Sequence, residues 1–251
     1  MSVIEFYDRL SPFYHLIYPD WEQSIVKQAG SLDAVIRESW GDRVKNVLDA
    51  ACGVGTQAIG LTQLGYKVTA CDISPASIER AQEETANRRL SIGFSVADMR
   101  ALSARYAQAF DLIIACDNAV PHLLSDSEIT TAFREFHRCT KPGGGCILSV
   151  RDYGAMDRDG TKVIPYGIRK EKDRCYLLFQ AWEFDGPICE VSLYVVEDRG
   201  GSDAMAHVMR TKYYAVSMDR LIELMEDAGY SDIRRIDGRF FQPLIIGTKR
   251  E

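Results

Sequence analysis

Two acidic residues flank a glycine turn in the first third of the chain. Asp49 ends the short apolar run that begins at Val47, and Cys52-Gly53-Val54-Gly55 follows it. Asp72 ends the next apolar run, which begins after Lys67. A strand, a Gly-x-Gly turn and a helix are typical of the nucleotide-binding half of an open α/β sheet. The turn glycines let the backbone approach a ligand closely, and the helix start offers it unpaired N–H groups.

The nucleotide could be a dinucleotide, because residues 53–58 also fit the pattern G-x-G-x-x-[GA]. Asp72 has the spacing at which a carboxylate binds ribose hydroxyls. Asp49, four residues before the first glycine, would repel a pyrophosphate and attract an ammonium. S-adenosylmethionine (SAM) carries an ammonium and no phosphate, so Asp49 favours SAM. The alternative is that Asp49 only caps the helix.

Further side chains for a nucleotide follow the third and fourth predicted strands. The third strand, residues 91–97, ends at Asp98-Met99, where an acid could accept from an adenine amino group and a methionine could pack on the ring. Asp98 could equally cap a turn. The fourth strand, residues 110–116, is nearly all apolar, as a central parallel strand should be. In doubly wound sheets the ligand crevice usually opens between the first and fourth strands, so residues 117–122 should face the Gly53 turn across it.

Polar residues on the far side of that crevice could hold a second molecule. Asn118 offers donors and an acceptor for a small polar ligand, unless it is only a turn residue. His122 could serve the site or be a structural histidine. Arg151, after the predicted strand 146–150, could bind a carboxylate through its bidentate fork or pair with a neighbouring acid.

Aromatic side chains crowd the first 21 residues. Ser11-Pro12 predicts a helix start, and Tyr18-Pro19 predicts its end. Ring faces attract cations, so this segment could close over a sulfonium as a lid and exclude water. It could also simply pack on the core. The rings are Phe6, Tyr7, Phe13, Tyr14, Tyr18 and Trp21.

The pattern of elements predicts a doubly wound, mostly parallel seven-stranded α/β sheet with an antiparallel β insertion after strand five. Three strands are expected in the insertion, at 174–184, 188–196 and 206–216, with Asp185-Gly186 as a hairpin turn. The final strands should include an antiparallel edge strand. The expected units are a lid and helix (1–40), the SAM-binding core (41–153), a β insertion covering the crevice (154–216) and the closing helix and strands (217–251).

Composition narrows the function classes. The 251 residues are 46% hydrophobic and carry a formal net charge of -6, and no basic stripe suggests nucleic acid as a partner. The seven cysteines are scattered and form no CxxC pair, so we expect reduced thiols of a cytoplasmic protein and no metal site. No apolar run is long enough to span a bilayer, so no membrane partner is expected.

The motifs together resemble those of class I SAM-dependent methyltransferases, with a Rossmann-like fold. The resemblance covers residues 45–150 and the closing elements, and rests on Asp49-x-x-Cys52-Gly53-x-Gly55, Asp72, Asp98 and the Lys141-Pro142-Gly143-Gly144 turn. It implies SAM as cofactor and S-adenosylhomocysteine as product. The cofactor-binding residues it implies are Tyr7, Tyr14, Tyr18, Asp49, Ala51, Gly53, Gly55, Asp72, Ile73, Asp98, Met99, Cys116 and His122.

Several segments are similar, more closely, to the glycine and sarcosine N-methyltransferases. Arg151-Asp152-Tyr153 resembles that family's Arg-Asn-Tyr stretch, whose arginine holds the substrate carboxylate. Tyr7-Asp8 and Tyr18-Pro19-Asp20 resemble its lid. Asp117 departs from the family, which has glycine there, and its carboxylate could attract a more cationic acceptor. The catalytic residues implied are Asn118, His122, Arg151, Tyr194 and Tyr213.

The sequence therefore predicts methylation of a small molecule, with N-methylation of a carboxylate-bearing amine such as glycine or sarcosine as the leading hypothesis. A quinone, a phenol or a polyamine would be another acceptor. A SAM-binding protein without activity and a nicotinamide oxidoreductase are the rival classes. A homo-oligomer is left open.

Overall fold

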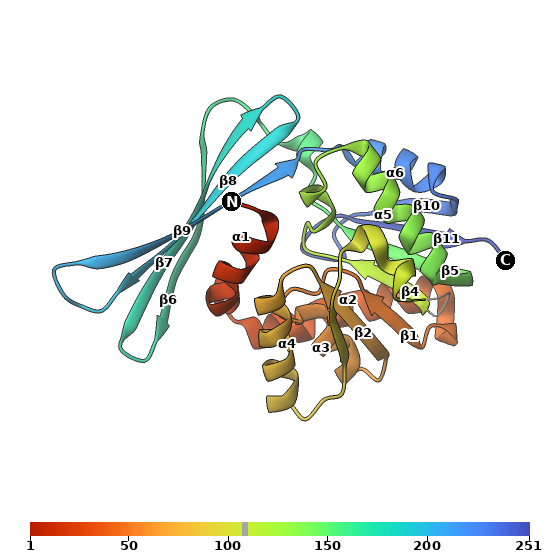
Figure 1. Cartoon of the computed structure of the whole chain (residues 1–251), viewed down its shortest axis with the longest axis horizontal. Coiled ribbons are helices and arrows are strands. Elements are labelled where there is room, and N and C mark those ends of the chain that lie inside the picture. The colour runs from red at the N-terminus through yellow and green to blue at the C-terminus, as the bar shows by residue number, and fades with distance from the viewer. Residues whose placement is uncertain (107–109) are drawn as a thin grey trace.

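The computed structural model describes residues 1–106 and 110–251. A seven-stranded sheet in the order β10-β11-β5-β4-β1-β2-β3 forms its centre (Figure 1). The strand β11 runs antiparallel to both of its neighbours, and the pairs among β1 to β5 are parallel. The strands are β1 (Asn46–Asp49), β2 (Lys67–Asp72), β3 (Gly93–Val96), β4 (Phe110–Ala115), β5 (Thr140–Ser149), β10 (Tyr230–Ile236) and β11 (Leu244–Lys249).

The predicted doubly wound sheet is confirmed, with one correction. The antiparallel strand is not at the edge, because β11 lies between β5 and β10. Strand order reverses between β1 and β4, which pair in parallel from Val47 to Asp49. In open α/β sheets a ligand binds beyond the carboxyl ends of the strands at such a reversal. This arrangement places the Gly53 turn and the segment after β4 on opposite sides of one crevice.

Helices cover both faces of the sheet because successive residues of a strand point to opposite sides. Val47 packs in the cluster formed with α2, α3 and α4, and Leu48 in the cluster formed with α5 and α6. Both side chains are fully buried. The helices are α2 (Trp21–Trp40), α3 (Thr56–Gln63), α4 (Pro75–Asn87), α5 (Asp126–Cys139) and α6 (Met218–Asp227), with 3₁₀ turns η2 (Gly41–Arg43), η3 (Met99–Ala104), η4 (Val120–His122) and η5 (Tyr153–Ala155).

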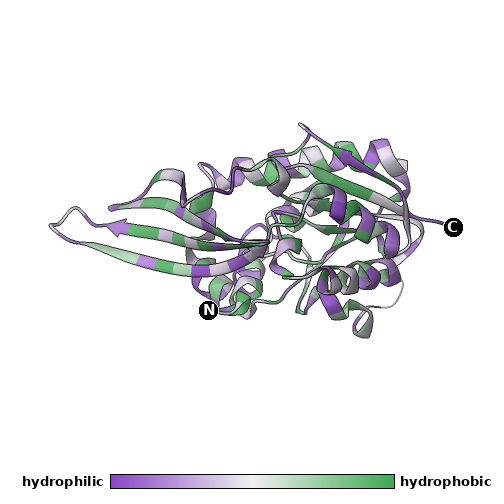
Figure 2. Ribbon diagram, turned by 90° about the horizontal axis from the view of Figure 1, so that it is seen from above, coloured by the Kyte–Doolittle hydropathy of each residue, from purple (hydrophilic) through white to green (hydrophobic). Residues whose placement is uncertain are grey.

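The insertion is an antiparallel sheet in the order β6-β7-β8-β9, one strand more than expected. The extra strand β6 contains Pro165 and Gly167, and the pairing with β7 shifts between them, so its alternation is interrupted in the sequence. Figure 2 shows hydrophilic and hydrophobic residues alternating along this sheet. The limits 154–216 for the unit stay a prediction. The strands are β6 (Lys162–Glu171), β7 (Arg174–Asp185), β8 (Ile188–Asp198) and β9 (Ala204–Tyr214).

The N-terminal segment begins with a helix that the sequence interpretation placed too late. Helix α1 (Val3–Leu10) comes first, capped by the Ser2 hydroxyl, which accepts from the Glu5 N–H at 3.1 Å. The expected helix from Ser11 is instead the 3₁₀ segment η1 (Ser11–Ile17). Helix α1 lies between β9 and α4, as Figure 1 shows. We call residues 1–20 the lid.

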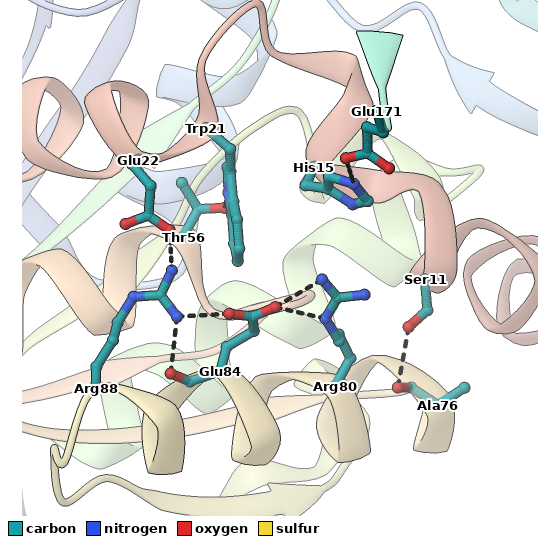
Figure 3. A network of polar contacts seen from close by, with 10 residues as sticks. All are labelled: Ser11, His15, Trp21, Glu22, Thr56, Ala76, Arg80, Glu84, Arg88 and Glu171. Carbon is teal, nitrogen blue, oxygen red and sulfur yellow. Dashed lines mark hydrogen bonds and ion pairs between the residues drawn. The ribbon is translucent and has the colours of Figure 1, made fainter. Parts of the chain in front are cut away.

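A polar network fixes the start of α2, directly after the lid, against the core (Figure 3). The Trp21 indole N–H donates to the Thr56 hydroxyl at 2.9 Å, and the Arg88 guanidinium lies 5.3 Å from the Trp21 ring centre. Arg88 also pairs with Glu22 and Glu84. These contacts tie α2 to the first turn of α3 and to the end of α4. None of the described helices has the length and apolarity needed to cross a membrane.

Candidate functional site

The glycine turn after β1 is held by the second acidic residue. Gly53 and Gly55 have φ angles of +52° and +95°, in the region that favours glycine. The Asp72 carboxylate accepts from the Gly53 N–H at 2.8 Å and from the Ser74 N–H at 2.9 Å. Burial raises the pKa of Asp72, and these N–H groups oppose the shift. Two backbone bonds leave part of the acceptor capacity of a carboxylate unused, so Asp72 can shape the turn and also bind a ligand hydroxyl.

A cavity of about 330 Å³ opens beside this turn. Gly55 is not part of its wall, because it is the N-cap of α3 and turns the chain into that helix. Tyr18 also lies elsewhere, in the wall of a second cavity. The structure brings ten of the predicted cofactor residues to the wall of the first cavity: Tyr7, Tyr14, Ala51, Gly53, Asp72, Ile73, Asp98, Met99, Cys116 and His122.

Asp49 is not in the wall either, and its predicted role toward an ammonium stays a prediction. Its side chain is fully buried next to Ala50 and Ala51, which do line the cavity. One carboxylate oxygen has no hydrogen-bond partner among the described residues, and the other accepts from the Ala51 N–H at 3.4 Å. Burial, with a smaller contribution from Asp72, raises the pKa of Asp49 to about 7. Since an unpaired buried anion is costly, a cation in the cavity would stabilise it.

Asp98 caps a turn and also lines the first cavity, so its predicted contact with an adenine amino group stays a prediction. Its carboxylate caps η3 by accepting from the Arg100 N–H at 2.9 Å and pairs with the Arg100 guanidinium at 2.6 Å. It also lines the first cavity beside Met99 and Ile73. The two apolar side chains suit a flat ring, and the neighbouring acid can accept from its amino group.

A second cavity of about 380 Å³ lies under the four-stranded sheet and the lid. Its walls come from the lid, β6, β7, β9 and the loops after β4, β5 and β10. Tyr7, Tyr14 and Asp117 line both cavities, so the two meet at these three side chains. The remaining lining residues are Phe6, Leu10, Ile17, Tyr18, Arg151, Tyr166, Gln180, Tyr213, Phe241 and Gln242.

Arg151 extends into the second cavity. Its guanidinium lies 4.7 Å from the ring centre of Trp182 and donates weakly to the Tyr166 hydroxyl at 3.4 Å. No carboxylate of the described residues forms an ion pair with it, so the neighbouring-acid alternative is not what the structure shows. A partly buried guanidinium without an anion can take a carboxylate ligand through two parallel hydrogen bonds.

His122 reaches the junction from η4. Its Nε2 lies 2.8 Å from the Tyr7 hydroxyl, and its Nδ1 lies 3.3 Å from the Thr211 hydroxyl. Burial lowers the pKa of His122 to about 3, so the ring is neutral at neutral pH. The neutral ring accepts through one nitrogen and donates through the other, which fixes the position of Tyr7 between the two cavities.

Two predicted catalytic residues lie outside both cavities. Asn118 is buried and uses its amide internally: it donates to the Tyr153 hydroxyl at 2.7 Å and accepts from the Arg151 N–H at 3.1 Å. It positions the Arg151 backbone instead of an acceptor. Tyr194 faces the outer side of the sheet and stacks on Phe179 at 4.7 Å. Tyr213, in contrast, faces inward and lines the second cavity.

Sequence reasoning missed several wall residues. Gln242 lies in the loop before β11, accepts from the Ser149 hydroxyl at 2.6 Å and donates weakly to Asp117 at 3.5 Å. Gln180 points inward from β7 because of strand parity. A glutamine in a loop carries no local signal, whereas the inward parity of Gln180 could have been read from its buried neighbours at even spacing.

Comparison with known proteins shows what this chain is similar to. Residues 47–144 match the family model described as "Methyltransferase domain". A glycine/sarcosine N-methyltransferase of Parasynechococcus marenigrum (strain WH8102) is 32% identical over 47% of this chain and 42% of its own length. The matches to curated enzymes of that name span about half of this chain and about half of each relative.

Solved structures extend the likeness to nearly the whole chain. A SAM-bound amino pentose methyltransferase from Micromonospora echinaspora superimposes with a TM-score of 0.80 and 17% identity, covering 95% of both chains. A sugar N-methyltransferase from Streptoalloteichus sp. ATCC 53650 superimposes with a TM-score of 0.77 and 15% identity. The match covers 92% of this chain and 90% of the sugar N-methyltransferase chain. Residues 47–144 are thus similar to a methyltransferase domain, and the chain as a whole has the Rossmann-like fold of these methyltransferase structures.

Proposed function

We propose that this protein transfers a methyl group from SAM to a small-molecule amine that carries a carboxylate. The observation that supports this most is the meeting of two cavities at Tyr7, Tyr14 and Asp117. One has walls suited to a nucleoside with a cationic tail, and the other holds the guanidinium of Arg151, which forms no ion pair with any described residue. A donor and an acceptor bound in the two cavities would face each other at the junction.

The first cavity suits SAM in each of its parts. Asp72 would accept from the ribose hydroxyls, and Ile73 and Met99 would pack on the adenine. The negative charge of Asp49, uncompensated among the described residues, would favour the ammonium of the amino-acid tail. When bound, SAM supplies an activated methyl group on a cationic sulfur.

The chain's own residues would then align and enclose the reactants. The rings of Tyr7 and Tyr14 attract a cation and close the junction against water. Holding two reactants in line can contribute about 7–11 kcal/mol to lowering the barrier. The methyl carbon–sulfur bond breaks as the carbon–nitrogen bond forms, so the amine needs a free electron pair. His122 is engaged with Tyr7, and the amine would release its proton to solvent beforehand.

The relatives suggest two kinds of amine. The named glycine/sarcosine N-methyltransferases point to an amino acid, and the sugar N-methyltransferases point to an amino sugar. An amino sugar without a carboxylate would leave Arg151 unpaired, so an amino acid is favoured. Quinones, phenols and polyamines leave it unpaired as well.

The test is a methyl-transfer assay read by mass spectrometry. SAM would be incubated with the protein and a panel of amino acids, N-methylated amino acids, amino sugars, polyamines and phenols. We expect a mass gain of one methyl group among the amino acids and none among the polyamines and phenols. Transfer confined to acceptors without a carboxylate would contradict the proposal.

A further inference from the structure

Asp117 and the residue after it both have the left-handed backbone conformation, which few residue types other than glycine, Asn and Asp adopt. Its φ angle is +55°, and that of Asn118 is +64°. The left-handed region costs about 1–2 kcal/mol per residue for most side chains, and somewhat less for Asp and Asn. The turn is held by the Asn118 N–H, which donates to the Ser149 carbonyl at 2.9 Å, and by the Asp117 N–H, which donates to the Ser149 hydroxyl at 3.2 Å. This turn directs the Asp117 carboxylate into the junction of the cavities.

The carboxylate of Asp117 has only neutral partners. It accepts from the Tyr14 hydroxyl at 2.9 Å, from the Tyr18 hydroxyl at 3.0 Å and, weakly, from the Gln242 amide. No cationic side chain of the described residues pairs with it. All three partners are neutral groups, so the described residues supply no counter-charge to this carboxylate at the junction.

Arg151 gives the same cavity a positive charge without a counter-charge. Asp117 and Arg151 line the cavity together, yet they form no ion pair with each other. Tyr213 is close enough to both groups for each to affect its pKa. Burial raises the pKa of Tyr213, Arg151 opposes this rise, and Asp117 adds to it. Unpaired charges in a partly buried site are costly. A ligand with an ammonium and a carboxylate would compensate both at once.

The size of the second cavity argues against the smallest such ligand. At about 380 Å³ it is no smaller than the first cavity, of about 330 Å³, which would hold SAM. Glycine is several times smaller than SAM. Most of the remaining wall is apolar or aromatic, from Phe6, Leu10 and Ile17 to Tyr166 and Phe241. An acceptor that fills this volume has an apolar body as well as its two charges.

We propose that Asp117 binds the acceptor nitrogen, as the ammonium on entry and through a remaining N–H once its proton has left for the transfer, and that Asp117 and Arg151 together select an amino acid with an apolar side chain larger than that of glycine. This rests on the proposed function and assigns the two ends of the acceptor: nitrogen at the junction, beside the methyl donor, and carboxylate at Arg151. Asp117 thereby determines specificity for amines over hydroxyl compounds.

The test compares paired ligands by calorimetry on the protein saturated with S-adenosylhomocysteine. Each pair is an amino acid and the hydroxy acid of the same skeleton, from glycine and glycolate to phenylalanine and phenyllactate. We expect the amino acid of the larger pairs to bind at least about tenfold more tightly, a difference of about 1.4 kcal/mol. Equal affinity within every pair, or strongest binding of glycine, would overturn the proposal.

The variant Asp117→Asn removes the charge and keeps the shape, and Asn tolerates a positive φ. We expect it to lose the preference for the amino acid and to bind S-adenosylhomocysteine within about twofold of the parent protein. Asp117→Gly is a second uncharged variant whose backbone suits this φ. The matched control is Asp232→Asn, because Asp232 is exposed and has a φ of +50°; it should keep the full preference.

Two outcomes separate this proposal from the proposed function. If Asp117→Asn keeps the preference for the amine, Asp117 does not bind the acceptor nitrogen and the inference is wrong. If the variant only weakens the binding of SAM relative to S-adenosylhomocysteine, Asp117 acts on the methyl donor and the inference is wrong as well. Methyl transfer by the parent protein could still be observed in that case. Conversely, ligand preference is measured without turnover, so it can be present even if the transfer assay fails.

Discussion

Individual charges define the chemistry of this molecule at the scale of the residue. Among the residues that the structure describes, one oxygen of the buried Asp49 has no hydrogen-bond partner, and no acidic side chain pairs with Arg151, which lies over Trp182. Neither arrangement stabilises the protein when no ligand is bound, because unpaired charges in partly desolvated sites are unfavourable. Both are explained if ligands supply the missing counter-charges.

Replacing Arg151 by glutamine should affect the acceptor and spare the donor. Glutamine keeps a polar end but loses the charge and the fork geometry. We expect the KM for an amino-acid acceptor to rise about tenfold to a hundredfold, corresponding to about 1.4–2.7 kcal/mol, with the Kd for S-adenosylhomocysteine nearly unchanged. Steady-state kinetics and calorimetry measure the two quantities. An equal loss of both would show that Arg151 has a structural role.

The raised pKa of Asp49 makes donor binding depend on pH. The carboxyl keeps its proton up to a pH of about 7 in the unligated protein, whereas in the unfolded chain it loses it near pH 4. The unligated protein therefore loses stability as the pH rises between these values. A bound ammonium needs the ionised form, so the affinity for S-adenosylhomocysteine should rise as the pH passes through 7.

The expected rise in this affinity is about tenfold between pH 6 and pH 7.5, following the ionised fraction of one carboxyl. Binding at pH 6 should release a proton, which titrations in buffers of different ionisation enthalpy detect. Asp49→Asn should remove both the pH dependence and the proton release. A parent protein whose affinity stays flat across this range would show that Asp49 does not sense the ligand.

At the scale of the element, the site depends on how closely α3 packs on α2. Gly60 faces α2 so tightly that an added Cβ would lie 2.6 Å from the Ala29 Cβ and 2.8 Å from the Ile25 carbonyl oxygen. Helix α3 begins at the glycine turn of the first cavity. A displacement of α3 would therefore move the backbone that faces the donor.

Gly60→Ala should destabilise the protein by about 1–3 kcal/mol through overpacking, and it should weaken S-adenosylhomocysteine binding. Urea unfolding and calorimetry measure the two effects. Gly30→Ala is the matched control: Gly30 is exposed in α2 with no atom within 4 Å of the added Cβ, and alanine should stabilise the helix by about 0.5–1 kcal/mol. A Gly60→Ala variant as stable as the parent would refute this view of the packing.

The lid is attached to both layers that it joins. The Asp8 carboxylate accepts from the Ser74 hydroxyl at 2.6 Å, at the start of α4. Arg169 of β6 donates to the Tyr18 carbonyl at 2.8 Å, and His15 pairs with Glu171 at 2.8 Å. The lid thus couples the four-stranded sheet to the seven-stranded sheet and its helices, and it brings Tyr7 and Tyr14 to the junction.

At the scale of the whole molecule, the central sheet could be predicted because its buried strands are apolar runs bounded by turns. β1 and β4 have this pattern, and their carboxyl ends identify the crevice. The residues around the first cavity could also be predicted, because they lie in local motifs directly after these strands. Ten of the predicted cofactor residues do line it.

What could not be predicted depends on register and on contacts between distant segments. Tyr194 and Tyr213 have the same residue type, yet the pairing of β8 and β9 turns only Tyr213 inward, and a shift of one residue inverts the faces. Asn118 was expected to meet a ligand, but its partner Tyr153 lies 35 residues away. Strand β6 was missed because Pro165 and Gly167 interrupt its alternation.

The most direct test of the account is a calorimetric titration of the folded protein with S-adenosylhomocysteine and, separately, with NAD. Because the Asp49 carboxylate would repel a pyrophosphate, we predict saturable one-to-one binding of S-adenosylhomocysteine and no heat with NAD. Binding of NAD without binding of S-adenosylhomocysteine would contradict the account.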